Sequence, residues 1–301
     1  MNLSVLEAIY HEVNHDPSEG QVTSYIPELA GINPDKFGAH IITRSGQSFG
    51  IGDHEEQFSI QSIVKVLSLT LAFQQKGESL WNRVGVEPSG SPFNSLWQLE
   101  YEQGIPRNPL INPGALVICD ILCSLYPDPW ATFLDFIRTV AGDNTISSNE
   151  KVSASEKKHG FRNAALINMM KSWGNIENDI DRVLDLYYRQ CAIEMSCAQL
   201  ARTFMLYANH GRLGNETVIT SSMAKRINAI MQTCGFYDEA GEYTFRVGLP
   251  GKSGVGGGIV ALHPGKYAIA VWSPKLNKKG NSVKGMMLLE KWTTETGMSI
   301  F

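Results

Sequence analysis

The sequence predicts an α/β protein of the α+β type, with one antiparallel sheet flanked by helices and a mostly helical lobe beside it. Strand-like runs occur only near the two chain ends, and the long middle has the apolar spacing of helices. The 301 residues, 43% of them hydrophobic, are enough for one unit with a full core. We expect a sheet lobe from about 1–61 and 241–301, and a helical lobe from about 62–240.

The N-terminal elements follow from local periodicity. Apolar residues recur at helical spacing from Leu3 to Val13, which predicts an amphipathic helix. Two short strand-like runs, 39–43 and 47–51, flank Arg44-Ser45-Gly46, and this pattern is typical of a β-hairpin. An apolar helix then begins at Ser62 and continues to Phe73.

The middle of the chain is predicted to be helical, with breaks at Asp128-Pro129, 141–143 and His210-Gly211. The expected helices are 116–126, 130–140, 163–173, 176–190, 196–209 and 221–231. The last sixty residues return to strands. We expect these at 243–247, 259–263 and 267–273, followed by a helix at 282–294. The sheet should therefore be assembled from both ends.

Composition excludes several classes of function. With 26 Lys+Arg against 30 Asp+Glu, the chain has no basic excess of the kind that nucleic-acid binding requires. No window approaches the roughly 18 apolar residues of a membrane span, and the first residues do not resemble a secretory signal, so we expect a cytoplasmic protein. The five scattered cysteines are expected to be buried, reduced thiols, and no metal site is expected.

Ser62 and Lys65 form the first candidate for chemistry. They fit the pattern S-x-x-K, in which a lysine one helical turn after a serine can act as its general base if burial lowers the lysine pKa. The pattern is weak alone, because three more matches occur: Ser148–Lys151, Ser155–Lys158 and Ser222–Lys225. Only Ser62 lies where strand-like residues enter a strongly apolar helix, which would bury Lys65.

Lys252–Gly258 is the second candidate. Its four glycines would let the backbone approach a ligand and would leave N–H groups free for an oxyanion, with Lys252 and Ser253 close by. Two further stretches offer Asn112, in the turn 106–114, and Glu156 with Asn163, in the loop-like run 155–163. Taken alone, each is more typical of turns and solvated charges than of a site.

Together these stretches resemble the bacterial-type serine-dependent glutaminases, over about residues 20–300. The residues that carry the resemblance are 58–65, 108–115, 155–157, 162–163, 183–191, 233–238 and 246–258. That family shares the fold of serine β-lactamases and penicillin-binding proteins. The resemblance therefore implies a β-lactamase-like fold, in agreement with the sheet predicted from both chain ends.

The resemblance also implies roles for individual residues. Ser62 is expected to be the nucleophile and Lys65 the base, and the matching substrate-binding positions are Asn112, Glu156, Asn163, Tyr187, Tyr237 and, through its backbone, Val255. The substrate would be L-glutamine, with no metal or organic cofactor, in a homo-oligomer that the family suggests is a tetramer. Pro113 after Asn112, and the run His159-Gly160-Phe161, depart from the expected family pattern and bear on loop geometry.

The expected chemistry is acyl transfer. Ser62, deprotonated by Lys65, would attack the side-chain amide, and the N–H groups of Ser62 and Val255 would hold the oxyanion. Glu156 would meet the substrate ammonium, and Lys252 would depress the Lys65 pKa by like-charge repulsion. Which tyrosine relays a proton stays open here. Two other functions also stay open: a β-lactam-recognising serine hydrolase and a non-catalytic amino-acid-binding module.

Overall fold

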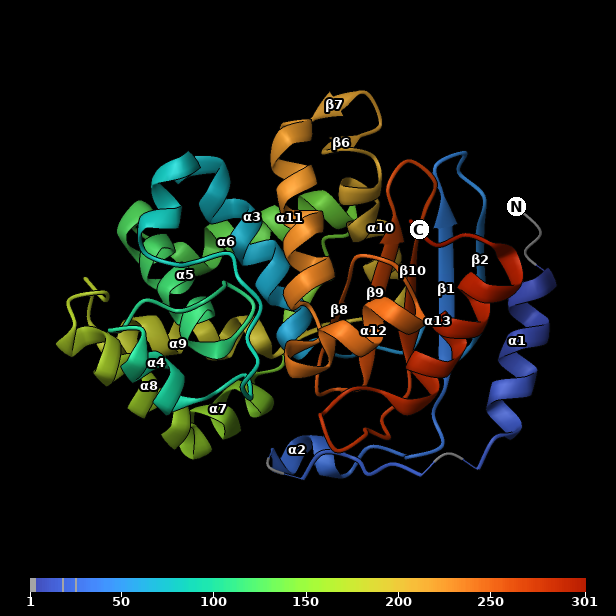
Figure 1. Ribbon diagram of the computed structural model, residues 1–301, viewed down its shortest axis with the longest axis horizontal. Coiled ribbons are helices and arrows are strands. Elements are labelled where there is room, and N and C mark those ends of the chain that lie inside the picture. The colour runs from blue at the N-terminus through green and yellow to red at the C-terminus, as the bar shows by residue number, and fades with distance from the viewer. Residues whose placement is uncertain (1–3, 18, 25) are drawn as a thin grey trace.

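A computed structural model describes residues 4–17, 19–24 and 26–301 of the chain (Figure 1). The sheet and its flanking helices lie on the right of Figure 1, and most helices of the chain's middle lie on the left. The C-terminus lies on the same right-hand side of Figure 1 as the sheet, α1 and α13. The start of the first predicted helix, Leu3, lies outside the described residues; the helix α1 covers Ser4–His15.

One five-stranded antiparallel sheet joins the two ends of the chain. Its order is β2-β1-β10-β9-β8. The strands are β1 (Gly38–Thr43), β2 (Ser48–Gly52), β8 (Gly251–Ser253), β9 (Gly258–His263) and β10 (Tyr267–Trp272). The central pair is β1 with β10, in which Gly38 faces Trp272 and Thr43 faces Tyr267. A sheet built from both chain ends is confirmed.

The two faces of the sheet pack against different helices. Ile41, Ile259 and Ile269 belong to a core that includes residues of α1, α12 (Ala240–Arg246) and α13 (Val283–Thr296). Val260 and Trp272 belong to the larger core, which continues through α10 (Cys197–Ala208) into the helical part. This alternation along β9 and β10 follows the two-residue repeat of a strand. The sheet is therefore covered on both faces.

The middle of the chain forms a helical body, as predicted. Its helices are α3 (Val64–Lys76), α4 (Leu96–Tyr101), α5 (Asn112–Leu125), α6 (Pro129–Ala141), α7 (Glu150–His159), α8 (Phe161–Ser172) and α9 (Ile180–Cys191). The helix α11 (Ser221–Cys234) packs near β8, and a short helix α2 (Pro27–Ala30) lies against α7. Short strands form two small sheets: β3 (Phe58–Ser59), β5 (Ile193–Met195) and β4 (Ser147–Ser148), and β6 (Arg212–Leu213) with β7 (Glu216–Thr217).

Two local predictions were wrong. The segment 243–247 is not a strand, because its residues lie in α12 and at its end, where Tyr243 is buried and Phe245 is 90% exposed. The alternation of large side chains there imitates a strand. The run 155–163 is not a loop, since it spans the end of α7 and the start of α8. The helix α7 is polar because only a narrow stripe of it is buried.

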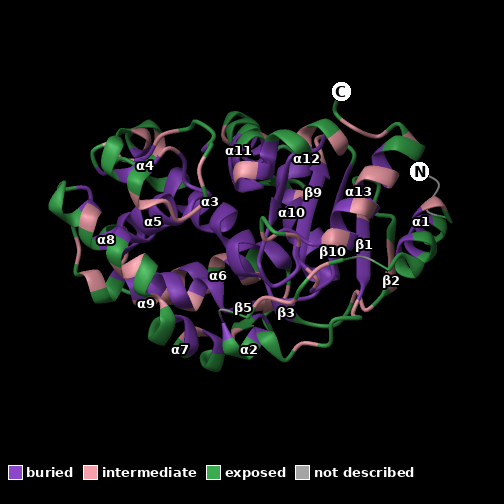
Figure 2. Ribbon diagram, turned by 60° about the horizontal axis from the view of Figure 1, so that its bottom comes forward, coloured by how far each residue is buried: buried purple, intermediate pink, exposed green. Residues whose placement is uncertain are grey.

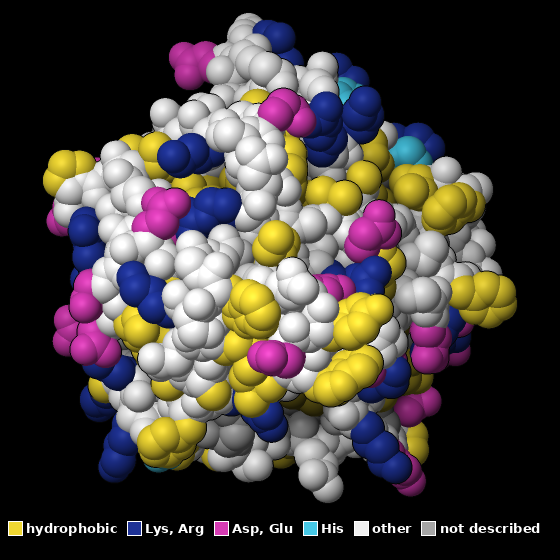
Figure 3. All heavy atoms as spheres, turned by 60° about the vertical axis from the view of Figure 1, so that its left-hand side comes forward, with side chains coloured by type: hydrophobic (Ala, Val, Ile, Leu, Met, Phe, Trp, Pro, Cys, Tyr) yellow, Lys and Arg dark blue, Asp and Glu magenta, His cyan; other side chains and the backbone are white. Residues whose placement is uncertain are grey.

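The interior of the protein is well packed, and its surface charges are mixed in sign. In Figure 2 the strands and the inner sides of the helices are buried, and exposed residues lie on the outer helix faces. All five cysteines are buried and unpaired, as predicted. On the face shown in Figure 3, Lys and Arg side chains are mixed with Asp and Glu. Within the described ranges, no helix has the length and apolarity that crossing a membrane requires.

Candidate active site

The segment that presents Ser62 runs directly from a strand into a helix. The strand β3 leads into a single 3-10 turn, Gln61–Ile63, and α3 follows at Val64. Gln61 has φ 49°, a left-handed conformation that is uncommon for residues other than glycine. This turn places Ser62, 9% exposed, at the wall of a cavity. The predicted strand-to-helix junction is confirmed.

The glycine-rich loop packs directly against this turn. A Cβ at Gly254 would lie 2.4 Å from the carbonyl oxygen of Ile60, and one at Gly256 would lie 2.1 Å from that of Ser59. Only glycine permits so close an approach of two backbones. The loop thereby brings Val255 to the cavity. Within the described part of the chain, neighbouring turns and caps leave the N–H groups of Ser62 and Val255 unused, so both are available to a ligand.

Lys65 is buried at 1% exposure, one turn into the apolar helix. Its Nζ donates hydrogen bonds to Asn112 Oδ1 at 2.7 Å and to the Leu110 carbonyl oxygen at 3.3 Å. Burial lowers the pKa of Lys65 to about 8, although the charge of Glu156 acts in the opposite direction. Near neutral pH a minor fraction of Lys65, roughly a tenth, is therefore neutral, far more than for an ordinary lysine.

Lys252 and Tyr237 lie near Ser62 and Lys65, behind the lining of the cavity. The Lys252 Nζ lies 4.1 Å, and the Lys65 Nζ 5.5 Å, from the centroid of the Tyr237 ring. Burial lowers the pKa of Lys252 well below its usual range, and the charge of Lys65 lowers it further. Burial is the largest cause of the lowered pKa of both lysines. Repulsion between two like charges is mutual, so the expected effect of Lys252 on the pKa of Lys65 stays a prediction.

The Tyr237 hydroxyl is linked to Ser62. Burial raises the pKa of Tyr237 above its ordinary value, and the hydrogen bond with Ser62 opposes that rise. Tyr237 has φ 56°, so it shares the left-handed backbone conformation of Gln61. Ser253 is fully buried, but its hydroxyl is 3.5 Å from the Gly235 carbonyl oxygen and does not line the cavity. The hydrogen-bond partner of Ser62 is therefore the Tyr237 hydroxyl and not the hydroxyl of Ser253.

A buried carboxylate closes the other side of the cavity. Glu156, on α7, accepts a hydrogen bond at 2.9 Å from Gln61 Nε2, which also donates to Ser59 Oγ. Burial raises the pKa of Glu156 to about 7, against the effects of the Gln61 hydrogen bond and the Lys65 charge. The sequence reasoning did not single out Gln61, because no local pattern predicts a left-handed glutamine. Its amide fixes one carboxylate oxygen and leaves the other for a ligand.

Two amides connect the lysine to the rest of the cavity. Asn112 is the first residue of α5, with Pro113 next to it, so the predicted turn ends in a helix start. Its Nδ2 donates to Asn163 Oδ1 at 2.9 Å while its Oδ1 accepts from Lys65. The Asn163 side chain also carries two amide N–H donors. One of these groups has Tyr188 as a hydrogen-bond partner.

The cavity brings most of the predicted residues together. It has a volume of about 170 Å³, and it is lined by Ile26, Gln61, Ser62, Phe93, Asn94, Asn112, Glu156, His159, Gly160, Arg162, Asn163, Tyr187, Cys191 and Val255. Lys65, Tyr237 and Lys252 lie behind this lining and reach it through Asn112 and Ser62. Phe93 and Asn94 were missed because they come from a segment without periodicity. The small cavity can hold a ligand with both charged and amide groups.

Comparisons with known proteins agree with this geometry. The family described as Glutaminase matches residues 20–301. A glutaminase of Christiangramia forsetii is 55% identical over 99% of this chain and 98% of its own length, and one of Saccharophagus degradans is 57% identical over 99% and 97%. Two solved structures are also similar: "Probable glutaminase ybaS" (TM-score 0.93, 31% identity, 100% of this chain and 99% of the other) and a Bacillus glutaminase (0.86, 34%, 98% and 99%).

A third structure, described as Mglu in its glutamate form, has a TM-score of 0.93 at 28% identity and covers all of this chain and 69% of the other. The resemblance noted in the sequence is confirmed over nearly the whole length. With a serine at the start of an apolar helix, a buried lysine of lowered pKa one turn later and full-length relatives of one kind, the chain belongs to the glutaminase family.

Proposed function

We propose that the chain hydrolyses the side-chain amide of L-glutamine to L-glutamate and ammonia through a Ser62 acyl-enzyme. The observation that carries the proposal is the position of Ser62, which lines the cavity and is hydrogen-bonded to Tyr237. The Tyr237 ring in turn lies close to the Nζ atoms of two buried lysines, Lys65 and Lys252. A serine becomes a nucleophile when a base in reach can take its proton. The family membership of the chain supports the same reaction.

In the acylation step, Ser62 Oγ forms a bond to the amide carbon and its proton moves to the neutral Lys65. We assign the relay of this proton to Tyr237, because Tyr237 is hydrogen-bonded to Ser62 and its ring lies close to Lys65. Tyr187, by contrast, is hydrogen-bonded to the Cys191 thiol. The C–N bond then breaks, the nitrogen takes the proton and ammonia leaves. Water repeats the attack with Lys65 as base, which releases glutamate and restores Ser62.

The N–H groups of Ser62 and Val255 are the proposed oxyanion donors. They are free of neighbouring backbone bonds, and the glycine loop holds them on the same wall. A donor of this kind contributes about 2.7–4 kcal/mol to the transition state. Lys252 is a positioning residue in this scheme, since its Nζ lies over the Tyr237 ring and donates to the Ser253 carbonyl oxygen.

Recognition of the amino-acid end uses the opposite wall. Glu156 would accept the substrate ammonium group, with one carboxylate oxygen already held by Gln61. The remaining amide donors of Asn163 and Asn112, together with Tyr187, would face the α-carboxylate. The solved structure in its glutamate form is a relative that supports an amino-acid ligand of this size.

The test is ammonia release from glutamine by the wild type, Ser62→Ala and a matched control, Ser68→Ala. Ser68 is a buried serine on α3, the helix that follows Ser62, and its hydroxyl donates to backbone carbonyl groups. We expect Ser62→Ala to lose at least about 10³-fold in kcat and Ser68→Ala to retain turnover. Near-normal turnover by Ser62→Ala would refute the proposed nucleophile.

We also propose the finer features of the organisation. The sheet lobe (about 1–61 and 241–301) and the helical lobe (about 62–240) would form one β-lactamase-like catalytic unit, supported by the position of Ser62 where β3 enters α3. The five unpaired thiols support a cytoplasmic location. The homotetramer is supported by the resemblance to the family, and sedimentation velocity would test it: a monomeric mass would contradict it.

A further inference from the structure

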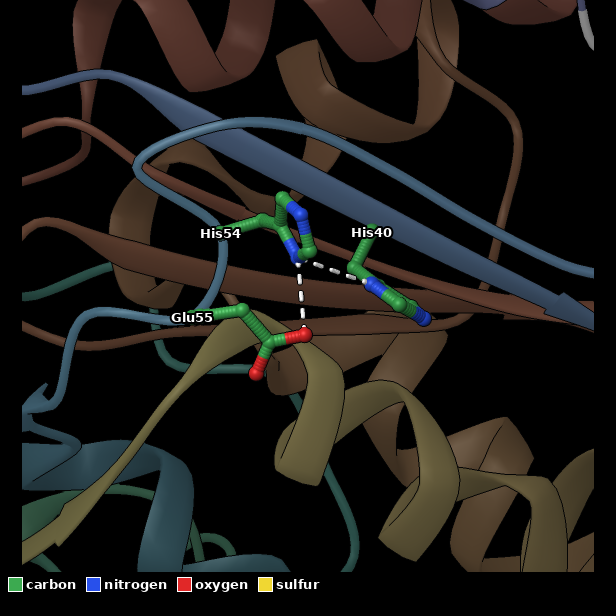
Figure 4. A group of neighbouring side chains, drawn as sticks. All are labelled: His40, His54 and Glu55. Carbon is green, nitrogen blue, oxygen red and sulfur yellow. Dashed lines mark hydrogen bonds and ion pairs between the residues drawn. The ribbon is translucent and has the colours of Figure 1, made fainter.

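Three side chains meet at a point on the sheet that the proposed reaction does not use. His40 lies on β1, and His54 and Glu55 lie in the turn that follows β2; Figure 4 shows that all three point toward one another. Their ligand atoms lie within 4.8 Å of one another. This is the one group of three potential metal-binding side chains found in the part of the chain that the structure describes.

We propose that His40 Nδ1, His54 Nδ1 and a carboxylate oxygen of Glu55 form a binding site for a zinc-class divalent cation. The His40 and His54 nitrogens are 3.2 Å apart, and His54 Nδ1 is 3.3 Å from Glu55 Oε1. Ligands at 2.0–2.1 Å from a tetrahedral Zn²⁺ are separated from each other by about 3.3 Å. Two edges of the required tetrahedron are therefore already formed.

Hydrogen bonds among His40, His54 and Glu55 do not fully explain why their nitrogen and oxygen atoms lie so close together. A single proton on His54 Nδ1 can point well at His40 or at Glu55, but it cannot point well at both. A cation at the centre accepts a lone pair from each of the three atoms. The other nitrogen of His40, Nε2, is 2.8 Å from Ser48 Oγ, which is the kind of outer partner that orients a metal-binding imidazole.

The surrounding backbone holds the three ligands in place. Gly50 faces His40 across the β1–β2 pair, and a Cβ at Gly50 would lie 2.4 Å from His54 Nδ1 and 2.6 Å from His40 Nδ1. Only a glycine leaves room for the cluster there. The turn itself is anchored by Asp53, whose carboxylate accepts from the Phe37 N–H, and the His54 carbonyl oxygen accepts from Ala198 at the start of α10.

The neighbouring cavity supplies an open coordination position. It has a volume of about 300 Å³ and is lined by polar groups that include His40, Glu55, Asp143 and Arg202. Arg202 opposes a cation, but the two carboxylates exceed it by one charge. Imidazole and carboxylate ligands with a water in the fourth position suit Zn²⁺ and other borderline metals better than Mg²⁺. Such an ion would tie β1 to the turn after β2 and to α10.

The test measures binding of Zn²⁺ by calorimetry to chelator-treated protein, in a background in which the exposed pair His11 and His15 is replaced by alanine. We compare the parent with His54→Ala, with Glu55→Gln and with a control, His210→Asn, an exposed histidine with φ 55° that asparagine tolerates. Glutaminase activity checks that each variant folds, because none of these residues belongs to the catalytic cavity.

We expect the parent and His210→Asn to bind one Zn²⁺ per chain and to give tetrahedral Co²⁺ absorption bands. His54→Ala and Glu55→Gln should each weaken the affinity at least tenfold and lose those bands, while Mg²⁺ should not compete. Zn²⁺ should raise the Tm of the parent but not that of His54→Ala. No binding by the parent, or equal binding by His54→Ala and Glu55→Gln, would overturn the site.

Discussion

The helix α5 carries one residue from each of two buried polar clusters, and the clusters differ in how completely they are satisfied. Asp120, in the middle of α5, is fully buried and accepts hydrogen bonds from Arg83, from the N–H groups of Glu177 and Asn178, and from the Asn178 amide. Burial alone would raise the pKa of Asp120, but these hydrogen bonds outweigh it and the pKa is lowered.

Asn112, at the start of the same helix, belongs to the cavity cluster. There the pKa of Glu156 is raised to about 7 and that of Lys65 is lowered to about 8, both mainly by burial. Full pairing around Asp120 holds a charge in place, whereas incomplete pairing around Lys65 leaves groups able to change charge during a reaction. Burial is common to both clusters, so the completeness of pairing separates the structural cluster from the catalytic one.

Lys65→Met should have the largest effect and tests the catalytic side of the comparison. Methionine keeps the apolar stem but removes the base, so kcat should fall by about 10²–10⁴-fold. The free energy of unfolding should stay the same or rise, because an incompletely paired buried amine is removed. Steady-state kinetics and urea unfolding measure the two effects. A Lys65→Met variant that loses stability but keeps kcat would place Lys65 with the structural cluster.

Asp120→Asn should show the opposite pattern. It leaves Arg83 without its carboxylate partner and should cost about 3–5 kcal/mol of unfolding free energy, while kcat of the folded protein is retained. Because the Asp120 pKa is depressed, its stabilisation is present above the pKa of the unfolded state and is lost as pH falls through the folded pKa. Urea unfolding at pH 7 and at lower pH should show this loss in the wild type but not in the variant.

Glu156→Gln should act on substrate binding. Losing a charged partner for the substrate ammonium should raise KM for glutamine about 10–100-fold, which corresponds to about 1.5–3 kcal/mol. The stability should not fall, since the raised pKa shows that burial disfavours this charge. Gln61→Leu is the matched comparison, because it removes the group that fixes Glu156 without removing the carboxylate. An unchanged KM in Glu156→Gln would rule out its role in binding the amine.

The pH dependence should show the smallest effect. In the proposed reaction both Lys65 and Glu156 act in their deprotonated forms, so kcat/KM should rise with pH through about 7 and about 8, by up to about tenfold per unit for each group below its pKa. A pH profile of glutamine hydrolysis measures this. In Glu156→Gln the lower limb should disappear and the limb near 8 should remain. A flat wild-type profile between pH 6 and 8 would contradict the lowered Lys65 pKa.

The elements that the sequence predicted correctly are those with a clear periodic spacing of apolar side chains. The hairpin of β1 and β2, the strands β9 and β10 and the apolar helix after Ser62 all have side-chain repeats that one face of an element requires. The segment 243–247 shows the limit, since its alternating large residues include an exposed Phe245 in a helix. Short elements such as β8 have too few residues for a period to be read.

Motifs and the family resemblance predicted the individual residues of the candidate site. The contacts between those residues could not be predicted from the sequence. Lys65 and Asn112 are 47 residues apart, and Gln61 and Glu156 are 95 apart, so no local pattern links them. Gln61 was missed because its role depends on a left-handed backbone that glutamine rarely adopts. The lowered pKa values of Lys65 and Lys252 depend on their burial, which only the folded chain determines.

The pairing of β1 with β10 has a consequence for how the chain is made. During synthesis, β1 leaves the ribosome more than two hundred residues before its partner, from Thr43 to Tyr267. At a synthesis rate of about 5–20 residues per second, the edge of β1 that will pair with β10 stays unpaired for on the order of ten seconds or more. The helical body can form in that interval from local contacts, and the sheet closes last. Truncation before β10 should therefore leave an aggregation-prone edge strand in the nascent protein.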